Sequence, residues 1–152
     1  MSASVSNLIT RLMTAVAVLA VCGVVISSVS LQHHFATSKT AYCEIGENFS
    51  CDIVNRSEYS SILGIPVALI GMLGYAALAG LATVYRGRRE TPTLLFAAAA
   101  AGLAFALYLT YIEGHVLGVW CILCLSSLAL ITLTTLLSAV IWWKARGQSA
   151  SS

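Results

Sequence analysis

The stretch VLGVWCILCLSSLALITLTTLLSAVIWW, residues 116–143, decides the fold of this chain. It carries no charged residue, and it is longer than the roughly 20 residues with which a helix crosses a bilayer core of about 30 Å. Two cysteines, Cys121 and Cys124, stand near its start. The stretch therefore predicts a membrane-spanning helix with a pair of thiols close to one membrane surface.

Three further uncharged runs, at residues 12–31, 62–85 and 91–112, are each long enough to span a membrane. The whole chain is 59% hydrophobic and 9% charged, with a mean hydropathy of +0.88, which is far from the composition of soluble domains. We therefore expect an all-α integral membrane four-helix bundle that forms a single domain over residues 1–152. The predicted helices cover about 9–31, 62–85, 92–113 and 117–143, and the first is expected to be a retained signal-anchor.

Basic residues predict the orientation of these helices, because short segments rich in Lys and Arg stay in the cytoplasm. Six of the eight basic residues flank the predicted helices on one side: Arg11, Arg86, Arg88, Arg89, Lys144 and Arg146. Both termini should then be cytoplasmic, and the polar loop at residues 32–61 should face the opposite compartment. The net charge of +2 gives no indication of a nucleic-acid partner.

The five cysteines are unevenly placed along the chain. Cys43 and Cys51 lie in the outer loop, and Cys121 and Cys124 begin the last helix on the same side. That side is the oxidising one, where disulfides form and persist. Cys22 stands alone in the first apolar run, and we expect it to be a small buried hydrophobic side chain.

The spacing of Cys121 and Cys124 suits thiol–disulfide exchange. Residues three apart share one face of a helix, so the two sulfurs are close enough to pair. Cys121 is expected at a helix N-terminus, where the macrodipole stabilises a thiolate, whereas Cys124 lies about one turn deeper and could meet a lipid-soluble partner. Two alternatives stay open: a zinc site built with the loop cysteines, and a pair of structural disulfides.

Taken together, these residues resemble the vitamin K epoxide reductase family. The resemblance is carried by the loop pair Cys43 and Cys51, by CDIVNRS at residues 51–57, by LGIPVALIGMLGY at 63–75 and by CILC at 121–124. It implies a relay in which Cys43 accepts electrons from a separate thioredoxin-like protein of the periplasm or lumen. Cys51 then attacks Cys121, and Cys124 reduces a quinone, which could be ubiquinone, menaquinone or vitamin K.

The resemblance also implies a quinone pocket near Cys124, with Ser57, Val67 and Leu128 as candidate contacts and no metal. Val67 and Leu128 stand where the animal enzymes carry Asn and Tyr. This departure favours a bacterial enzyme, in the inner membrane with its cysteines on the periplasmic side, that supports disulfide bond formation. Alternative functions are reduction of vitamin K epoxide or quinone, and a non-enzymatic membrane protein with structural disulfides.

Polar residues outside these motifs carry weaker signals. Glu113 and His115 precede the last helix, and we interpret them as solvated interface residues rather than as proton relays to a quinone. The outer loop is acidic, and we expect it to attract a partner with a basic rim. Its charged residues are Glu44, Glu47, Asp52 and Glu58, against Lys39 and Arg56.

Overall fold

The computed structural model describes residues 3–37 and 43–151, so Lys39 and part of the predicted outer loop lie outside the described residues. Most of the described chain is helical. The long helices are α1 (Ala3–Phe35), α3 (Val67–Thr83), α4 (Thr91–Ile112) and α5 (Ile122–Ala150). The short elements are α2 (Cys51–Arg56), the 3₁₀ turn η1 (Glu58–Ser60), strands β1 (Ser61–Ile62) and β2 (Ile65–Pro66), and the π-helical turn η2 (Glu113–Leu117).

Helix length and composition confirm the predicted class of protein. Within the described ranges, three segments are long and apolar enough to cross a membrane: Ala3–Phe35, Thr91–Leu117 and Ile122–Ala150. Helix α3 is equally apolar but has only 17 residues. The chain is therefore an all-α membrane protein with three to four membrane-length helices. That all four helices span the bilayer stays a prediction.

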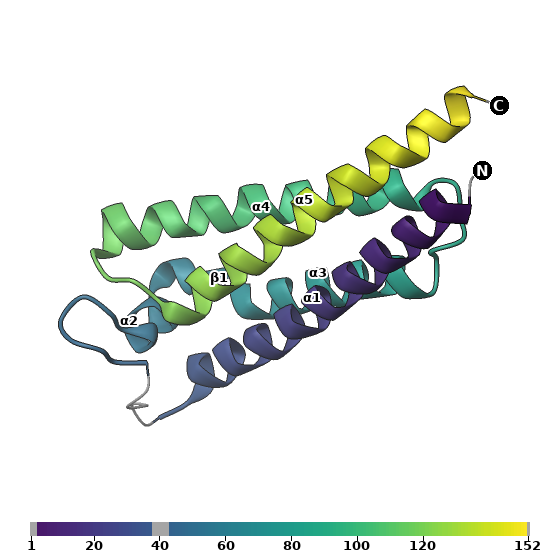
Figure 1. The fold of residues 1–152 in the computed structure, drawn as a ribbon. Coiled ribbons are helices and arrows are strands. Elements are labelled where there is room, and N and C mark those ends of the chain that lie inside the picture. Colours follow the sequence, from purple (N-terminus) through teal and green to yellow (C-terminus); the bar gives the residue numbers. More distant parts are fainter. Residues whose placement is uncertain (1–2, 38–42, 152) are drawn as a thin grey trace.

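The four long helices share one hydrophobic core. Helix α1 packs against α3 and α5, and α4 packs against α5 and α3, so the helices run lengthwise beside one another (Figure 1). The buried core side chains are Met13, Val16 and Ala20 of α1, Tyr75, Leu78 and Ala82 of α3, Leu95 and Ala99 of α4, and Ile131 and Ile141 of α5. This core fixes the helix ends that carry the cysteines.

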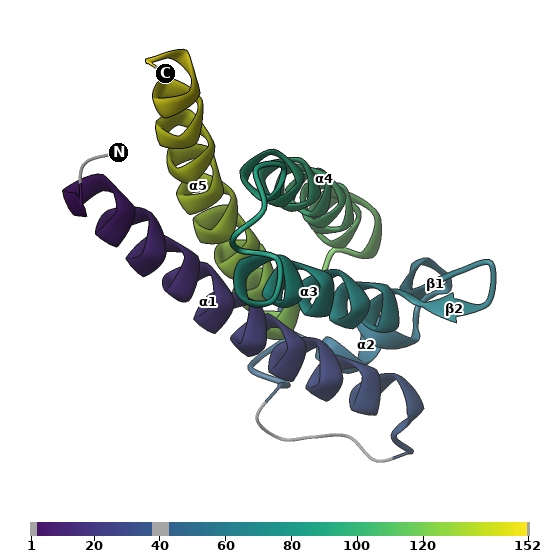
Figure 2. The ribbon, with the colours of Figure 1, turned by 90° about the vertical axis from the view of Figure 1, so that its right-hand side faces the viewer.

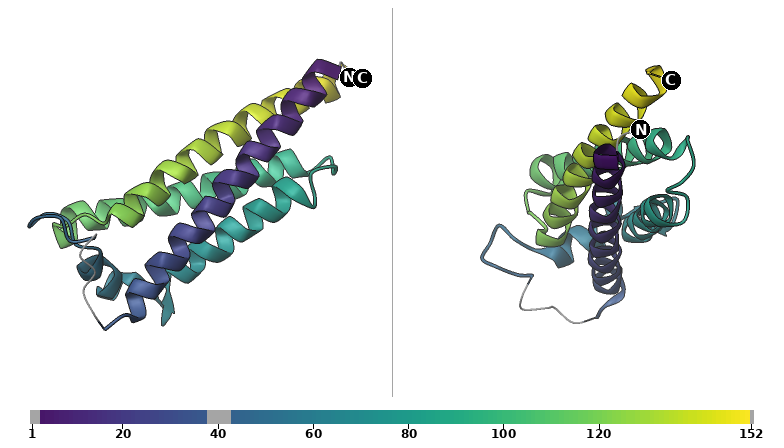
Figure 3. Two further views of the ribbon diagram at one scale, coloured as in Figure 1. Left: turned by 60° about the horizontal axis from the view of Figure 1, so that its bottom comes forward. Right: turned by 45° about the vertical axis from the view of Figure 1, so that its right-hand side comes forward.

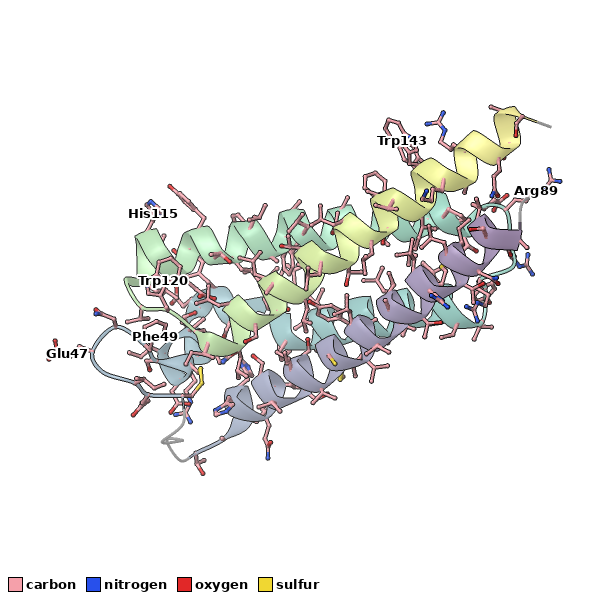
Figure 4. All side chains as sticks on the ribbon, viewed as in Figure 1. Glu47, Phe49, Arg89, His115, Trp120 and Trp143 are labelled. Carbon is pink, nitrogen blue, oxygen red and sulfur yellow. A yellow bond between two sulfur atoms is a disulfide. The ribbon has the colours of Figure 1, made fainter. Side chains whose placement is uncertain are left out.

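The two ends of the helix group differ in character. The start of α1 and the end of α5 lie at one end, together with the α3–α4 connection, in Figure 1 and in the left view of Figure 3. Helix α2 and the segment before it lie at the other end (Figure 1). Arg89, from the α3–α4 connection, is close to the termini in Figure 4, whereas Glu47 lies at the far end. The segregation of charge that the sequence predicts is thus present along the long axis.

The predicted start of the second helix at residue 62 is wrong. Residues 61–66 instead form an antiparallel hairpin that pairs Ser61 with Pro66 and projects beyond the start of α3 (Figure 2). Its turn places Leu63 at φ 53° and Gly64 at φ 81°. A left-handed backbone cannot continue a right-handed helix, so α3 begins only after Pro66.

The last helix also begins later than predicted. Gly118, at φ 65°, follows the π-helical turn in a left-handed conformation, which glycine adopts without steric cost. Cys121 is extended, at φ −110° and ψ 119°, and is the N-cap of α5. Helix α5 therefore starts at Ile122 rather than at residue 117, and it continues past the predicted end at 143 to Ala150.

The expectation for Cys22 is also wrong. Its side chain is exposed on α1 instead of buried. Gly23, the next residue, is on the packed face of the helix, where an added Cβ would lie 2.3 Å from the Tyr75 ring. Cys22 therefore faces away from the neighbouring helices.

Candidate functional site

Helix α2 positions the second loop cysteine. Ser50 is its N-cap, and the Ser50 side chain accepts a hydrogen bond from the backbone N–H of Ile53. At the other end, Ser57 is the C-cap residue, and its Oγ donates to the Val54 carbonyl at 2.8 Å. These caps define a helix of six residues that begins with Cys51.

A backbone pairing holds the outer loop against the start of α5. The backbone N–H of Ser50 donates to the Trp120 carbonyl at 3.1 Å, and the N–H of Trp120 donates to the Asn48 carbonyl at 2.9 Å. Phe49 and Trp120 form the resulting parallel bridge, and they lie near each other in Figure 4. Since Cys51 follows Ser50 and Cys121 follows Trp120, the hydrogen bond between Ser50 and Trp120 brings Cys51 close to Cys121.

Three of the cysteines lie in one buried cluster. Cys43 and Cys51 form a disulfide with their Cα atoms 5.5 Å apart. The exposed fractions are 2% for Cys43 and 0% for both Cys51 and Cys121, and Val54 completes the buried set. The structure thus brings the predicted loop pair into contact with the first cysteine of the helix pair.

Asn55 connects the two halves of this cluster. Its Nδ2 donates to the Cys51 carbonyl at 3.0 Å and lies 4.0 Å from the Cys121 sulfur. Its Oδ1 accepts a hydrogen bond of 2.7 Å from Ser30 of α1. No role in the site was predicted for Asn55, although its position four residues after Cys51 places both residues on one face of a short helix.

Two histidines in the last turn of α1 contact α2. His33 Nδ1 lies 3.6 Å from Asp52 Oδ1, and both side chains are buried. His34 makes a second contact through Nδ1, which is hydrogen-bonded to the Asn55 carbonyl. These contacts explain why α1 reaches Phe35 instead of ending at residue 31: its polar last turn is covered by protein.

The helix pair consists of two free thiols. A hydrogen bond from the Cys124 thiol holds the pKa of Cys121 below its ordinary value of 9.0, although burial and the nearby Glu113 carboxylate act in the opposite direction. Backbone N–H groups of the first turn of α5 also stabilise the thiolate. Cys121 is therefore the readily ionised member of the pair.

Cys124 opens onto a cavity of about 400 Å³ between the helices. Apolar side chains from α3 and α4 line most of it, including Val67 and Phe105, and polar groups such as His34 and Ser57 gather toward the outer loop. A volume of this size, apolar with a few polar groups, is typical of sites for small organic ligands.

The chain matches the model of the Vitamin K epoxide reductase family over residues 14–139. The chain belongs to this family. The matched region contains both cysteine pairs, the four long helices in whole or in part, and the cavity. Membership in the vitamin K epoxide reductase family implies an oxidoreductase of the membrane, and it confirms the resemblance seen in the sequence.

The candidate quinone contacts of this vitamin K epoxide reductase homologue are not all in one place. Ser57, Val67 and Cys124 line the cavity. Leu128 is not among the residues that line it and packs instead against the main core. Ser127 occupies the neighbouring position on the cavity wall, where Tyr75 donates a hydrogen bond of 2.8 Å to its carbonyl.

The interpretation of Glu113 as a solvated residue is wrong. Its side chain is 2% exposed, and Oε2 accepts a hydrogen bond of 3.2 Å from the backbone N–H of Cys121. His115, by contrast, is exposed and stacks on Tyr111. Nothing in the local sequence separates the two, because the difference arises from the π-helical turn that directs Glu113 inward.

Metal ligation has no support among the residues that the structure describes. Within residues 3–37 and 43–151, no group of three or more His, Cys, Asp or Glu side chains is arranged to hold a metal ion. The two loop cysteines are joined to each other.

Proposed function

We propose that this chain oxidises a separate thioredoxin-like protein and passes the electrons to a quinone through Cys43, Cys51, Cys121 and Cys124. Net reaction converts a donor dithiol and a quinone into a donor disulfide and a hydroquinone. The proposal depends on one observation: the four cysteines form an unbroken path from the outer loop to the cavity. Three lie in one buried cluster, and the fourth lines the cavity.

The proposed order of exchange accounts for the sulfurs as they are paired. The Cys43–Cys51 disulfide together with free Cys121 and Cys124 corresponds to the stage after the loop pair has passed two electrons to the helix pair. In the preceding step, the Cys51 thiolate attacks Cys121 and releases Cys124. Cys43 then attacks Cys51, and the loop disulfide forms again as Cys121 is freed.

The cavity supports a quinone as the electron acceptor. Its apolar part, between α3 and α4, suits a quinone ring and the start of its isoprenoid tail. The polar groups near Cys124 suit the two ring oxygens. Ubiquinone, menaquinone and vitamin K share this chemistry, and Ser57 and Val67 are the proposed contacts besides Cys124.

The proposed setting is the bacterial inner membrane, with both termini cytoplasmic and the cysteines on the periplasmic side. All four long helices then span the bilayer as a bundle. The position of both termini at the end opposite to α2 supports this arrangement, as does the clustering of basic residues near that end. The partner would be periplasmic, and the product would be disulfide bonds in exported proteins.

The test is an assay of purified protein with a reduced thioredoxin-like donor and, in separate reactions, ubiquinone, menaquinone and vitamin K. Loss of quinone absorbance reports turnover. Cys124→Ala should reduce turnover to background, because it removes the thiol at the cavity. Cys22→Ala is the matched control, since Cys22 is an exposed cysteine of α1, and equal loss in both variants would contradict the relay.

Trapping tests the order of the relay independently of the quinone. In Cys124→Ser, Cys121 has no partner in its own helix and should accumulate as a Cys51–Cys121 disulfide, which peptide mapping detects. Recovery of only the Cys43–Cys51 disulfide from this variant after incubation with the donor and a quinone would argue against the direct exchange.

A further inference from the structure

Glu113 is a buried acidic side chain next to the helix pair that the relay leaves without a role. It begins the π-helical turn after α4, and its side chain is 2% exposed. A buried ionisable group in a membrane protein is costly, and such groups mark proton or ion pathways. Its position therefore calls for a chemical explanation.

The carboxyl group contacts the relay at Cys121 and lines the same cavity as Cys124. Oε2 accepts the hydrogen bond from the backbone N–H of Cys121, and the carboxyl also interacts with the Cys124 thiol. Oε1 is buried and has no hydrogen-bond partner among the residues that the structure describes. One oxygen thus anchors the group, while the other is available to a ligand or a proton.

Glu113 and Cys124 both line the cavity. The other titratable side chains that line it are His34 of α1, Tyr59 of η1 and Tyr75 of α3. His34 is bonded to the Asn55 carbonyl, and the Tyr75 hydroxyl is bonded to Ser127. Tyr59 is exposed. Among these groups, Glu113 alone combines burial, a hydrogen bond to the helix pair and an unbonded oxygen in the described part of the chain.

We infer that Glu113 is the proton carrier between the Cys124 thiol and the quinone, which rests on the function proposed above. As Cys121 and Cys124 form their disulfide, two electrons pass to the quinone and both sulfur–hydrogen bonds are lost. Glu113 takes the proton of Cys124 and gives it to one quinone oxygen. The second oxygen takes a proton from water, which replaces the one that Cys121 released on ionising.

The decisive variant is Glu113→Gln, which keeps an oxygen for the Cys121 N–H but cannot carry a proton. The protein is reduced in full, freed of reductant and mixed with ubiquinone in a single turnover at several pH values. Quinone reduction at neutral pH should fall by about a hundredfold, as expected for loss of a general acid–base. The rate of thiol exchange between the reduced donor and the loop pair should stay unchanged.

His115→Gln is the matched control, because His115 is a titratable residue of the same turn but is exposed. It should leave both half-reactions intact. Glu113→Asp retains a carboxyl and should keep more quinone reduction than Glu113→Gln, with a displaced pH profile. A wild-type rate and pH profile in Glu113→Gln would overturn the inference, and so would equal losses in the Gln and Asp variants or in both half-reactions.

The same experiments distinguish failure of the proposed function from failure of the role of Glu113. If the unmodified protein exchanges thiols but reduces none of the quinones, the quinone-linked function is overturned, and the role of Glu113 with it. If the unmodified protein reduces a quinone and Glu113→Gln does so equally well, only the role of Glu113 is overturned.

Discussion

Ser30 is a single residue on which the alignment of two cysteines depends. Its Oγ donates to Asn55 Oδ1 at 2.7 Å, and Asn55 in turn lies against Cys51 and Cys121. Ser30→Ala leaves a buried acceptor without its donor, which costs roughly 1–3 kcal/mol. We expect exchange between Cys51 and Cys121 to slow at least about fivefold, because 1 kcal/mol of lost alignment corresponds to that factor in rate.

Rapid acid quench followed by thiol mapping measures this step. Ser28→Ala is the matched control, because Ser28 is exposed on the same helix and its Oγ bonds to the Val24 carbonyl and the Met72 sulfur, not to Asn55. Equal rates in the two variants would show that Asn55 is held by its other contacts.

The acidity of Cys121 also depends on one neighbour. The hydrogen bond from Cys124 is the largest cause of its lowered pKa, whereas burial and Glu113 raise it. Cys124→Ala removes the lowering contribution, so the pKa of Cys121 should rise and less thiolate should be present at neutral pH. Thiolate absorbance near 240 nm, recorded against pH with Cys22, Cys43 and Cys51 replaced, should shift to higher pH, and an unchanged curve would contradict this cause.

Among single residues, the sequence predicted those with distinctive chemistry and failed for those defined by packing. The cysteine pairs were found because their spacing is specific. The burial of Glu113 and the exposure of Cys22 were not. In a uniformly apolar helix, the sequence does not distinguish the packed face from the exposed one, so the exposure of Cys22 could not be predicted. A carboxyl near a helix end is usually solvated, so the burial of Glu113 was not expected.

At the scale of elements, the contact between α1 and α3 depends on one small residue. A Cβ on Gly23 would lie 2.3 Å from the Tyr75 ring, which must then move. Gly23→Ala should destabilise the protein by about 1–3 kcal/mol, as overpacking does, and should weaken the bond between Tyr75 and Ser127 on the cavity wall. A thermal melt in detergent measures the loss of stability.

Gly80→Ala supplies the comparison for this change. An added Cβ on Gly80 of α3 meets nothing within 4 Å, and Ala favours a helix over Gly, so the melting temperature should stay the same or rise slightly. If both substitutions lower the melting temperature equally, the loss does not arise from contact with Tyr75.

The sequence predicted that the four long helices exist, but it did not predict where they begin and end. Runs of 20 or more apolar residues identify spans because the bilayer sets a minimum length. The ends depend on local backbone and on covering segments. Leu63 and Gly64 form a left-handed turn inside an apolar run, and the last turn of α1 persists because α2 pairs Asp52 with His33.

At the scale of the whole molecule, the proposed topology places residues 47 and 149 on opposite sides of the membrane. Glu47 is exposed near α2, and Ser149 is exposed near the C-terminus of α5. In a Cys22→Ala background, a membrane-impermeant maleimide should label Glu47→Cys in intact cells. It should label Ser149→Cys only after permeabilisation, and the reverse pattern would contradict the orientation.

The acidic outer loop predicts a second property of the whole molecule. Glu47 is exposed and points away from the helices (Figure 4), so its charge acts on an approaching partner. Glu47→Lys should slow oxidation of a thioredoxin-like donor at low salt, and a small dithiol donor should be oxidised at nearly the original rate. The measurement is the ratio of the two rates in the unmodified protein and in the variant. An equal fall in rate for both donors would indicate that Glu47 has a role in loop structure.

Burial of the sulfurs has a consequence for the compartment around the protein. Cys43, Cys51 and Cys121 have at most 2% of their surface exposed. In this conformation of the outer loop, the three sulfurs are therefore shielded from molecules in solution. Free glutathione or another small thiol that collides with this surface meets very little sulfur surface. Electron entry then requires the outer loop to move away from the sulfurs, which slows the oxidation of unrelated reductants in solution and limits how fast they consume quinone.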